Sequence, residues 1–113
     1  MNNSGLTLLV MLISGRSALL TGDADYSRLM HAKAKSVDHL VATHHGARFT
    51  AGVTSVPMPN NKDSAFVISY GYRNVYRHPH PEALRKHASA GWTKYVTTAG
   101  RKSIAARGDR SIT

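Results

Sequence analysis

The sequence predicts one small α/β domain, with a mixed β-sheet and flanking helices. Short apolar runs that end at Gly, Ser, Thr or Asp alternate with two stretches of helical character, and such alternation is typical of layered α/β domains. The length of 113 residues allows a single domain with a modest core, and the apolar fraction of 42% is ordinary for a folded chain. We find no repeat, low-complexity segment or linker.

A β-hairpin is predicted at the start of the chain. The run Leu6–Ile13 is rich in leucine and is bounded by Gly5 and by Ser14-Gly15, which predicts a buried strand. A second apolar run at residues 18–20 follows across a glycine-containing turn. A membrane helix needs about 20 apolar residues, and a signal peptide needs a basic leader. The first run has eight residues and no Lys or Arg before it, so we expect no targeting or membrane segment.

The middle of the chain predicts a helix and then a strand. Residues Asp25–Lys35 place an acidic residue at the start and lysines at the end, where each charge suits the helix dipole. Leu29 and Met30 would face the core. Residues Val37–Thr43 then predict a strand that ends at His44-His45-Gly46.

The second half of the chain predicts a loop, a strand, a helix and two further strands. Prolines and asparagines interrupt any period in the loop, a proline suits the first turn of the helix, and Gly91 ends that helix. The expected elements are a loop over residues 47–63, a strand at Ala65–Tyr70, a helix over 81–90, and strands at Trp92–Thr98 and Ser103–Ala106.

The composition restricts the partners and the chemistry. Fifteen basic residues against six acidic ones give a net charge of +9, which favours anionic partners such as nucleic acid, phosphorylated ligands or an acidic membrane face. Since the charges are spread along the chain, a merely solvated surface is the alternative. The absence of cysteine excludes disulfides, Cys-ligated zinc, iron–sulfur sites and thiol catalysis. Any metal must be held by histidines and carboxylates.

Three polar clusters each follow a predicted strand. They are Thr21-Gly22-Asp23, His44-His45-Gly46 and the segment from Asn74 to Pro81. Ligands of α/β sheets gather beyond the strand ends, and a carboxylate with several imidazoles suits zinc, manganese or iron. Each cluster alone is weak evidence, because Gly-Asp is usually a turn and a His-His pair is more often surface or core. Their shared position favours a site.

The order and spacing of these motifs resemble the metallo-β-lactamase fold. More narrowly, they resemble the hydrolase-like domain at the end of ComEC-type DNA-uptake competence proteins, from about Asn2 to about Arg107. The motifs that carry the resemblance are Asn2-Asn3-Ser4-Gly5-Leu6, Leu19-Leu20-Thr21-Gly22-Asp23, His44-His45-Gly46, Val67-Ile68-Ser69-Tyr70-Gly71 and Asn74-x-Tyr76-x-His78-Pro79-His80-Pro81. The resemblance implies an αββα sandwich with a mixed sheet and flanking helices.

The first half of that family's domain carries an H-x-H-x-D-H cluster, which this sequence lacks. The resemblance therefore implies that residues 1–113 form one partial domain, the C-terminal half of the fold, without the N-terminal half. Half of a two-layer fold exposes a sheet face and a sheet edge. We accordingly expect self-association.

The resemblance also implies roles for individual residues. Asp23 corresponds to the carboxylate that bridges or approaches two metals. Either His44 or His45 corresponds to a ligand of the second metal; the glycine two residues after His44 favours His44, and the choice stays open. His78 corresponds to a substrate-orienting or acid group beside the metals.

The segment around His78 implies further substrate contacts, from Asn74, Tyr76 and His80. For His80, a place at the start of the following helix is the equal alternative. Arg77 stands where related sequences often have glycine. Three histidines match no motif, and we expect them at the surface or on a helix face: His31, His39 and His87.

The function implied is that of a fragment of a metal-dependent hydrolase, acting in the intact protein on phosphodiesters or nucleic acid with zinc or manganese. Alone, the chain is expected to bind metal weakly and to turn nothing over, because zinc sites usually need three protein ligands. The alternatives are a non-catalytic, basic nucleic-acid-binding module and a truncated remnant without activity.

Overall fold

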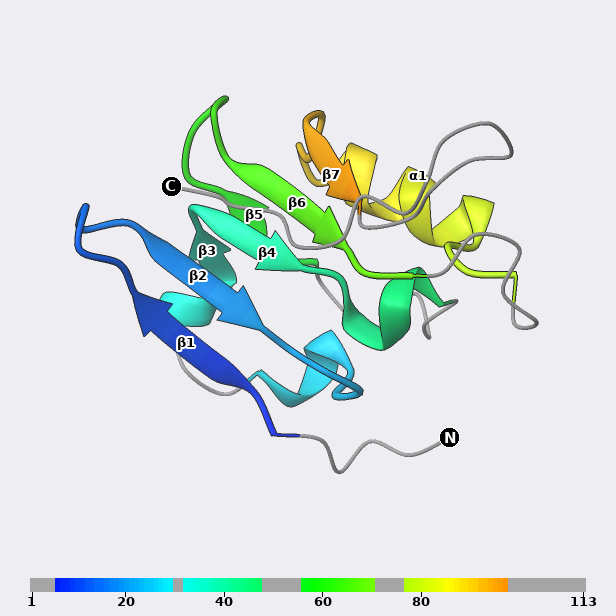
Figure 1. Ribbon diagram of the computed structural model, residues 1–113, viewed down its shortest axis with the longest axis horizontal. Coiled ribbons are helices and arrows are strands. Elements are labelled where there is room, and N and C mark those ends of the chain that lie inside the picture. The colour runs from blue at the N-terminus through cyan, green and yellow to red at the C-terminus, as the bar shows by residue number, and fades with distance from the viewer. Residues whose placement is uncertain (1–5, 30–31, 48–55, 71–76, 98–113) are drawn as a thin grey trace.

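Five strands form the main sheet in the computed structural model (Figure 1), which describes residues 6–29, 32–47, 56–70 and 77–97. In sheet order they are β1 (Leu8–Met11), β2 (Ser17–Leu20), β4 (His39–Val41), β6 (Ala65–Ile68) and β7 (Tyr95–Thr97). β1 is antiparallel to β2, whereas β2, β4, β6 and β7 run parallel. This mixed sheet, with one α-helix among the described residues, confirms the α/β class.

The predicted hairpin forms, but its first strand is not buried. β1 and β2 pair with Leu9 opposite Leu19, and the turn closes through a 2.7 Å bond from the Leu12 N–H to the Arg16 carbonyl. β1 lies at the edge of the sheet, and Leu9 is the one residue of the strand that is half-buried. Leu8 is 52% exposed and Met11 60% exposed, so the prediction of a buried strand over Leu6–Ile13 is wrong.

The predicted helix over Asp25–Lys35 is wrong as well. The described residues form two 3₁₀ turns instead, η1 (Tyr26–Arg28) and η2 (Ala32–Lys35). The Asp25 carboxylate caps η1 by accepting the Ser27 N–H at 3.0 Å. Tyr26 and Leu29 are both buried, and a spacing of three residues places them on one side of a 3₁₀ turn. Met30 lies outside the described residues.

The predicted strand over Val37–Thr43 is interrupted at Asp38. It divides into β3 (Ser36–Val37) and β4, and β3 pairs in parallel with β5 (Met58–Pro59) within the expected loop. The Asp38 carboxylate accepts the Ser17 N–H at 2.8 Å, which fixes the bend against β2. β4 ends at Val41, and the 3₁₀ turn η3 (Thr43–Gly46) follows it.

The C-terminal elements agree better with the sequence. β6 begins at Ala65 as expected, and α1 (Pro81–Ser89) has proline in its first turn. β7 begins at Tyr95 and not at Trp92 as predicted, because Trp92 instead turns into the core, where its indole N–H donates to the Pro57 carbonyl at 2.7 Å. The expected strand over Ser103–Ala106 lies outside the described residues. No helix in the described part of the chain is long and apolar enough to cross a membrane.

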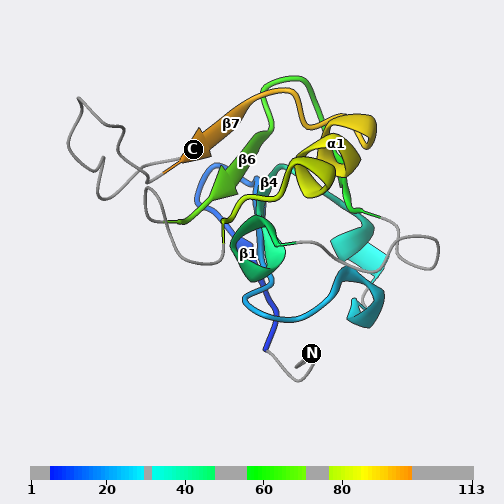
Figure 2. The same ribbon diagram turned by 90° about the vertical axis from the view of Figure 1, so that its right-hand side faces the viewer.

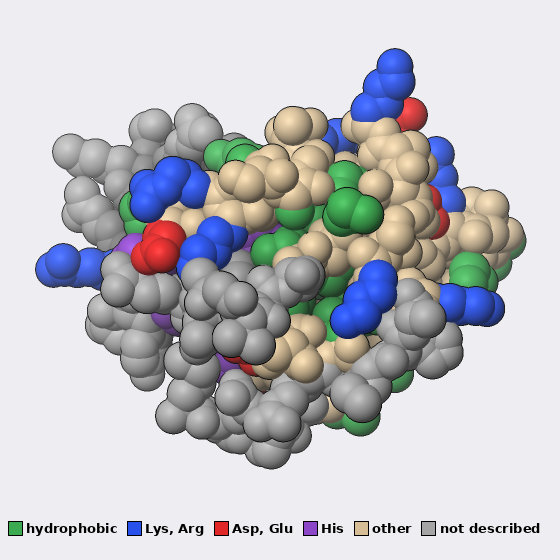
Figure 3. All heavy atoms as spheres, turned by 180° about the vertical axis from the view of Figure 1, so that it is seen from behind, with side chains coloured by type: hydrophobic (Ala, Val, Ile, Leu, Met, Phe, Trp, Pro, Cys, Tyr) green, Lys and Arg blue, Asp and Glu red, His purple; other side chains and the backbone are tan. Residues whose placement is uncertain are grey.

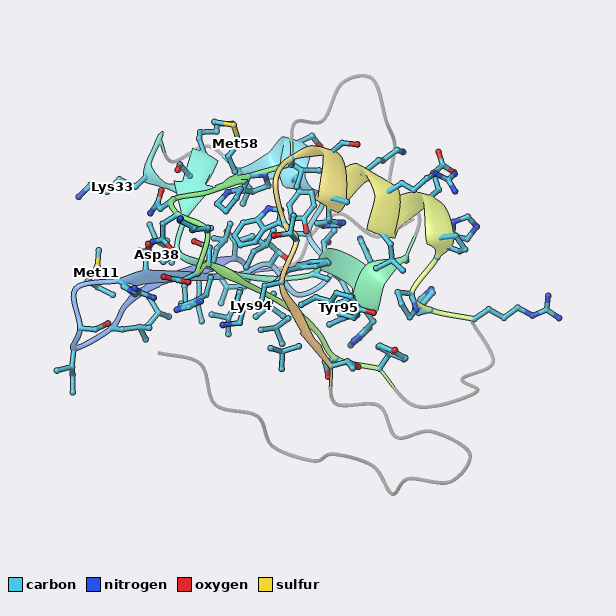
Figure 4. All side chains as sticks on the ribbon, turned by 90° about the horizontal axis from the view of Figure 1, so that it is seen from above. Met11, Lys33, Asp38, Met58, Lys94 and Tyr95 are labelled. Carbon is cyan, nitrogen blue, oxygen red and sulfur yellow. The ribbon has the colours of Figure 1, made fainter. Side chains whose placement is uncertain are left out.

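The helical elements lie on one side of the sheet (Figure 2), and Figure 4 shows the same layering from above. The core between the layers consists of side chains that are almost fully buried. They are Leu19, Tyr26, Leu29, Ala34, Val37, Leu40, Ala42, Phe66, Ile68, Ala83 and Trp92.

Two histidines expected at the surface or on a helix face are buried. His87 is 1% exposed, because it follows Ala83 by one helical turn on the inner face of α1. His39 is 2% exposed, and its Nδ1 accepts the Ala65 N–H at 3.2 Å. His31 lies outside the described residues.

A row of aliphatic side chains crosses the other face of the sheet. The strand registers align the row, which consists of Leu8, Leu20, Val41, Val67 and Val96. Side chains alternate between the faces along each strand, so the row lies opposite the core residues. Leu8 and Leu20 are exposed and the three valines are half-buried.

Candidate functional site

The carboxyl ends of β2, β4 and β6 meet at one edge of the sheet, where the predicted clusters come together. The His44 Nδ1 atom lies 3.6 Å from the Asp23 Oδ1 atom. The two loops are also joined through the backbone, since the His44 N–H donates to the Gly22 carbonyl at 2.9 Å. The expected juxtaposition of Asp23 and His44 is therefore confirmed, and it follows from parallel strand order.

The turn η3 presents its two imidazoles from an unusual backbone. His44 has φ 47° and ψ 36°, and His45 has φ 57° and ψ 30°. These left-handed conformations cost about 1–2 kcal/mol for each non-glycine residue. Gly46, which follows with φ 81°, has no such cost. The surrounding contacts must hold the two histidines in place.

The imidazole of His45 is oriented by a backbone carbonyl. Its Nδ1 lies 2.7 Å from the Ser69 oxygen, and a carbonyl can only accept, so Nδ1 carries the proton and donates. The lone pair of the neutral ring is then on Nε2. Ser69 was not predicted as a site residue. The available signal was its place in the motif Val67-Ile68-Ser69-Tyr70-Gly71, near the end of the predicted strand Ala65–Tyr70.

The imidazole of His44 has one nitrogen beside a carboxylate and the other without a partner. Nδ1 faces Asp23, whereas Nε2 is buried and has no hydrogen-bond partner among the described residues. Leaving such an atom unsatisfied costs about 1–3 kcal/mol. Histidines that bind metals are typically oriented through their other nitrogen by a carboxylate or carbonyl. The Ser69 carbonyl orients the Nδ1 atom of His45 in this way, and the Nδ1 atom of His44 has the Asp23 carboxylate 3.6 Å away.

The segment from Arg77 to His80 packs against η3. The His80 N–H donates to the Gly46 carbonyl at 2.8 Å. A Cβ atom on Gly46 would lie only 2.6 Å from the Pro79 Cβ, so this approach requires glycine. Arg77 has φ 56°, a left-handed backbone conformation that glycine favours.

The electrostatics of His78 show that four imidazoles share this end of the molecule. Burial lowers the pKa of His78, and repulsion from His45, His44 and His80 lowers it further. The structure thus unites histidines that follow different strands. Asn74 and Tyr76, the other predicted substrate contacts of this segment, lie outside the described residues.

His80 caps the helix that follows it. Its Nδ1 accepts the Glu82 N–H at 3.2 Å, which confirms the alternative placement at the helix start. In the neutral ring the proton is therefore on Nε2. His80 could offer a metal a lone pair only by giving up the cap.

The described residues do not complete a metal site. Within residues 6–29, 32–47, 56–70 and 77–97, no group of three or more His, Asp or Glu side chains is placed to hold an ion. The buried Nε2 atom of His44 has no hydrogen-bond partner among these residues, and a bound ion would give it one.

The comparisons with known proteins found no matching family model, no matching curated protein and no matching solved structure. The roles of Asp23, His44, His45, His78 and His80 therefore depend on the geometry of the site and on the sequence motifs.

Proposed function

We propose that this chain is the second half of a metallo-β-lactamase-like domain and supplies part of the metal site of a hydrolase that acts on phosphodiesters. The observation that carries the proposal is the convergence of Asp23 with His44, which His45 follows in the chain, beyond the ends of parallel strands. Both imidazoles have oxygen neighbours at Nδ1, which favours metal binding through Nε2.

The residues of the chain have distinct tasks in this proposal. His44 and His45 would hold the ion, and Asp23 would orient His44 or bridge to a second ion. When bound, zinc or manganese supplies Lewis-acid activation of water and of a phosphoryl oxygen. His78 would face the substrate as a neutral imidazole, because its pKa is lowered. The proton on Nε2 of His80 would suit a phosphate oxygen.

The aliphatic row on the outer face of the sheet supports the two-layer architecture. Five apolar side chains in register form a strip across five strands, and sheets with such faces pack against another layer. In the proposed αββα sandwich, the half that bears H-x-H-x-D-H covers this face. A second copy of the chain would be the occupant if the chain self-associates.

A basic nucleic-acid-binding module without catalysis is the second candidate, and the net charge of +9 favours it. Several basic side chains are exposed, namely Lys33, Lys35, Lys62, Arg77, Arg85 and Lys94. On the face shown in Figure 3, Lys and Arg side chains are scattered over the face and its rim. This spacing is compatible with contacts to a phosphate backbone but does not form one dense patch.

Calorimetric zinc titration tests the metal-binding part of the proposal. We expect weak binding that His44→Ala and His45→Ala each reduce by about tenfold or more, and that Asp23→Ala also weakens. His31→Ala is the matched control, because it removes an imidazole that belongs to no motif. Equal binding by all variants would refute the assignment of these ligands.

A phosphodiesterase assay tests the activity. The chain alone is expected to be inactive with zinc or manganese, whereas adding a half that carries H-x-H-x-D-H should create activity that Asp23→Asn abolishes. Turnover by the 113 residues alone that is lost in Asp23→Asn would refute the partial site. If no half restores activity but DNA binding persists, the binding module is the better account; if neither is seen, the chain is an inactive remnant.

A further inference from the structure

A buried tyrosine–histidine pair lies directly behind η3. The Tyr26 hydroxyl is 2.6 Å from Nε2 of His87, and each residue is 1% exposed. The pair joins α1 to η1, two elements that are 61 residues apart at this contact. Phe66 stacks on the His87 ring with 4.2 Å between centroids, which fixes the plane of the imidazole. Neither Tyr26 nor His87 belongs to a predicted cluster.

The direction of each hydrogen bond follows from the chemistry of the groups. The Nδ1 atom of His87 lies 2.6 Å from the Ala83 carbonyl, which can only accept, so Nδ1 carries the proton. In the neutral ring Nε2 is then an acceptor, and the Tyr26 hydroxyl must donate to it. The hydroxyl oxygen remains available as an acceptor.

That oxygen accepts the backbone N–H of Thr43, the first residue of η3, at a long distance of 3.4 Å. The Thr43 hydroxyl donates to the Ala24 carbonyl at 2.5 Å. Thr43 is thus held at both its amide and its side chain by the segment that Tyr26 anchors. His44 and His45 follow immediately, in the left-handed backbone that needs external support.

We infer that the Tyr26–His87 pair positions the metal-binding turn, and that Tyr26 and His87 are positioning residues for the imidazoles of His44 and His45. The inference rests on the proposed function for the role of the two imidazoles, although the placement of the turn can be measured without metal. The direction of the bonds requires both side chains to be neutral. Burial lowers the pKa of His87 to about 4 and raises that of Tyr26, which keeps both neutral around pH 7.

The test compares three ways of changing the pair. Tyr26→Phe keeps the ring and removes the hydroxyl, and His87→Leu removes the acceptor. His87→Gln keeps an acceptor near the position of Nε2 and is the rescue variant. Trp92→Phe is the matched control. It also removes one buried hydrogen-bond donor, the indole N–H that bonds to the Pro57 carbonyl, and Trp92 is not part of η3.

The readouts are imidazole nitrogen NMR at one fixed pH, which reports the tautomers of His44 and His45, and zinc affinity by calorimetry. Tyr26→Phe and His87→Leu should alter the imidazole signals and weaken zinc binding by about tenfold, as loss of supporting contacts does at metal sites. His87→Gln and Trp92→Phe should leave both close to wild type.

Unchanged imidazole signals in folded Tyr26→Phe would overturn the inference. If that variant does not fold, unchanged signals in His87→Leu would do the same. If Trp92→Phe alters the imidazole signals and the zinc affinity as much as Tyr26→Phe does, the effect is a general loss of stability, and the inference is overturned. If the signals respond as expected but the wild type binds no zinc, the proposed function fails while the positioning role stands.

Discussion

Acidification should destabilise the fold through one buried histidine. His87 is enclosed by Phe66, Tyr26 and α1, and burial lowers its pKa from the ordinary 6.5 to about 4. In the unfolded chain the same ring titrates near 6.5. Above that pH both states are neutral and His87 has no effect on the pH dependence. Between pH 6.5 and about 4 the ring is protonated in the unfolded chain but stays neutral in the folded one, so the free energy of unfolding falls.

The size of the loss follows from the pKa difference. Each unit corresponds to about 1.4 kcal/mol, so the shift from 6.5 to about 4 predicts a loss of about 3 kcal/mol as the pH falls through this range. Below pH 4 both states are protonated and this contribution stops changing. Small domains have total stabilities of about 5–15 kcal/mol, so the loss is a large share of the total.

Urea unfolding followed by fluorescence measures this effect. Trp92 is the single tryptophan and is 3% exposed, which makes it a sensitive probe of the core. His87→Gln is the comparison, because glutamine does not titrate and any packing loss is independent of pH. The difference in stability between wild type and variant should narrow or reverse as the pH approaches 4. The same pH dependence in both proteins would show that His87 is not held neutral.

Three further predictions concern the site and its surface. Gly46→Ala should cost about 1–3 kcal/mol in urea unfolding, because φ is 81° and the new methyl would meet Pro79 at 2.6 Å; an unchanged midpoint would contradict the packing of the two loops. Arg77→Gly should instead stabilise the chain by about 1 kcal/mol, because it removes the strain of a left-handed backbone conformation at an exposed arginine. A lower midpoint in urea unfolding would contradict this. DNA binding, measured by fluorescence anisotropy, should weaken as the salt concentration rises. The logarithm of the binding constant should fall against the logarithm of the salt concentration with a slope of about −0.9 per neutralised phosphate. If no binding is seen at low salt, the net charge of +9 serves only to keep the surface solvated.

Local patterns predicted the fold where a single signal was sufficient. β6 combines β-branched and aromatic residues, and α1 has proline at its start and Gly91 directly after Ala90. The segment Asp25–Lys35 had the charge pattern of a helix, yet it forms two 3₁₀ turns. There, burial of Tyr26 and Leu29 and the bonds to η3 outweigh a weak intrinsic preference.

Local patterns also predicted one part of the candidate site and missed another. Asp23 and His44 could be placed together because the ends of neighbouring parallel strands converge, whatever the details of the loops. His87 could not be found by motif, but its spacing from Ala83 and Ala90 was a signal for the inner face of α1. Burial of a histidine depends on partners such as the Tyr26 hydroxyl, which no local pattern contains.

The backbone of η3 connects stability with the proposed chemistry. Two consecutive left-handed histidines are unfavourable, and glycine at either position would remove the strain. The turn persists because Gly22, Ala24 and His80 each form a hydrogen bond with it from outside. Such an arrangement adds strain and leaves the buried Nε2 of His44 without a partner among the described residues. Strain and an unsatisfied atom in the same turn are best explained if the imidazoles have a ligand to hold.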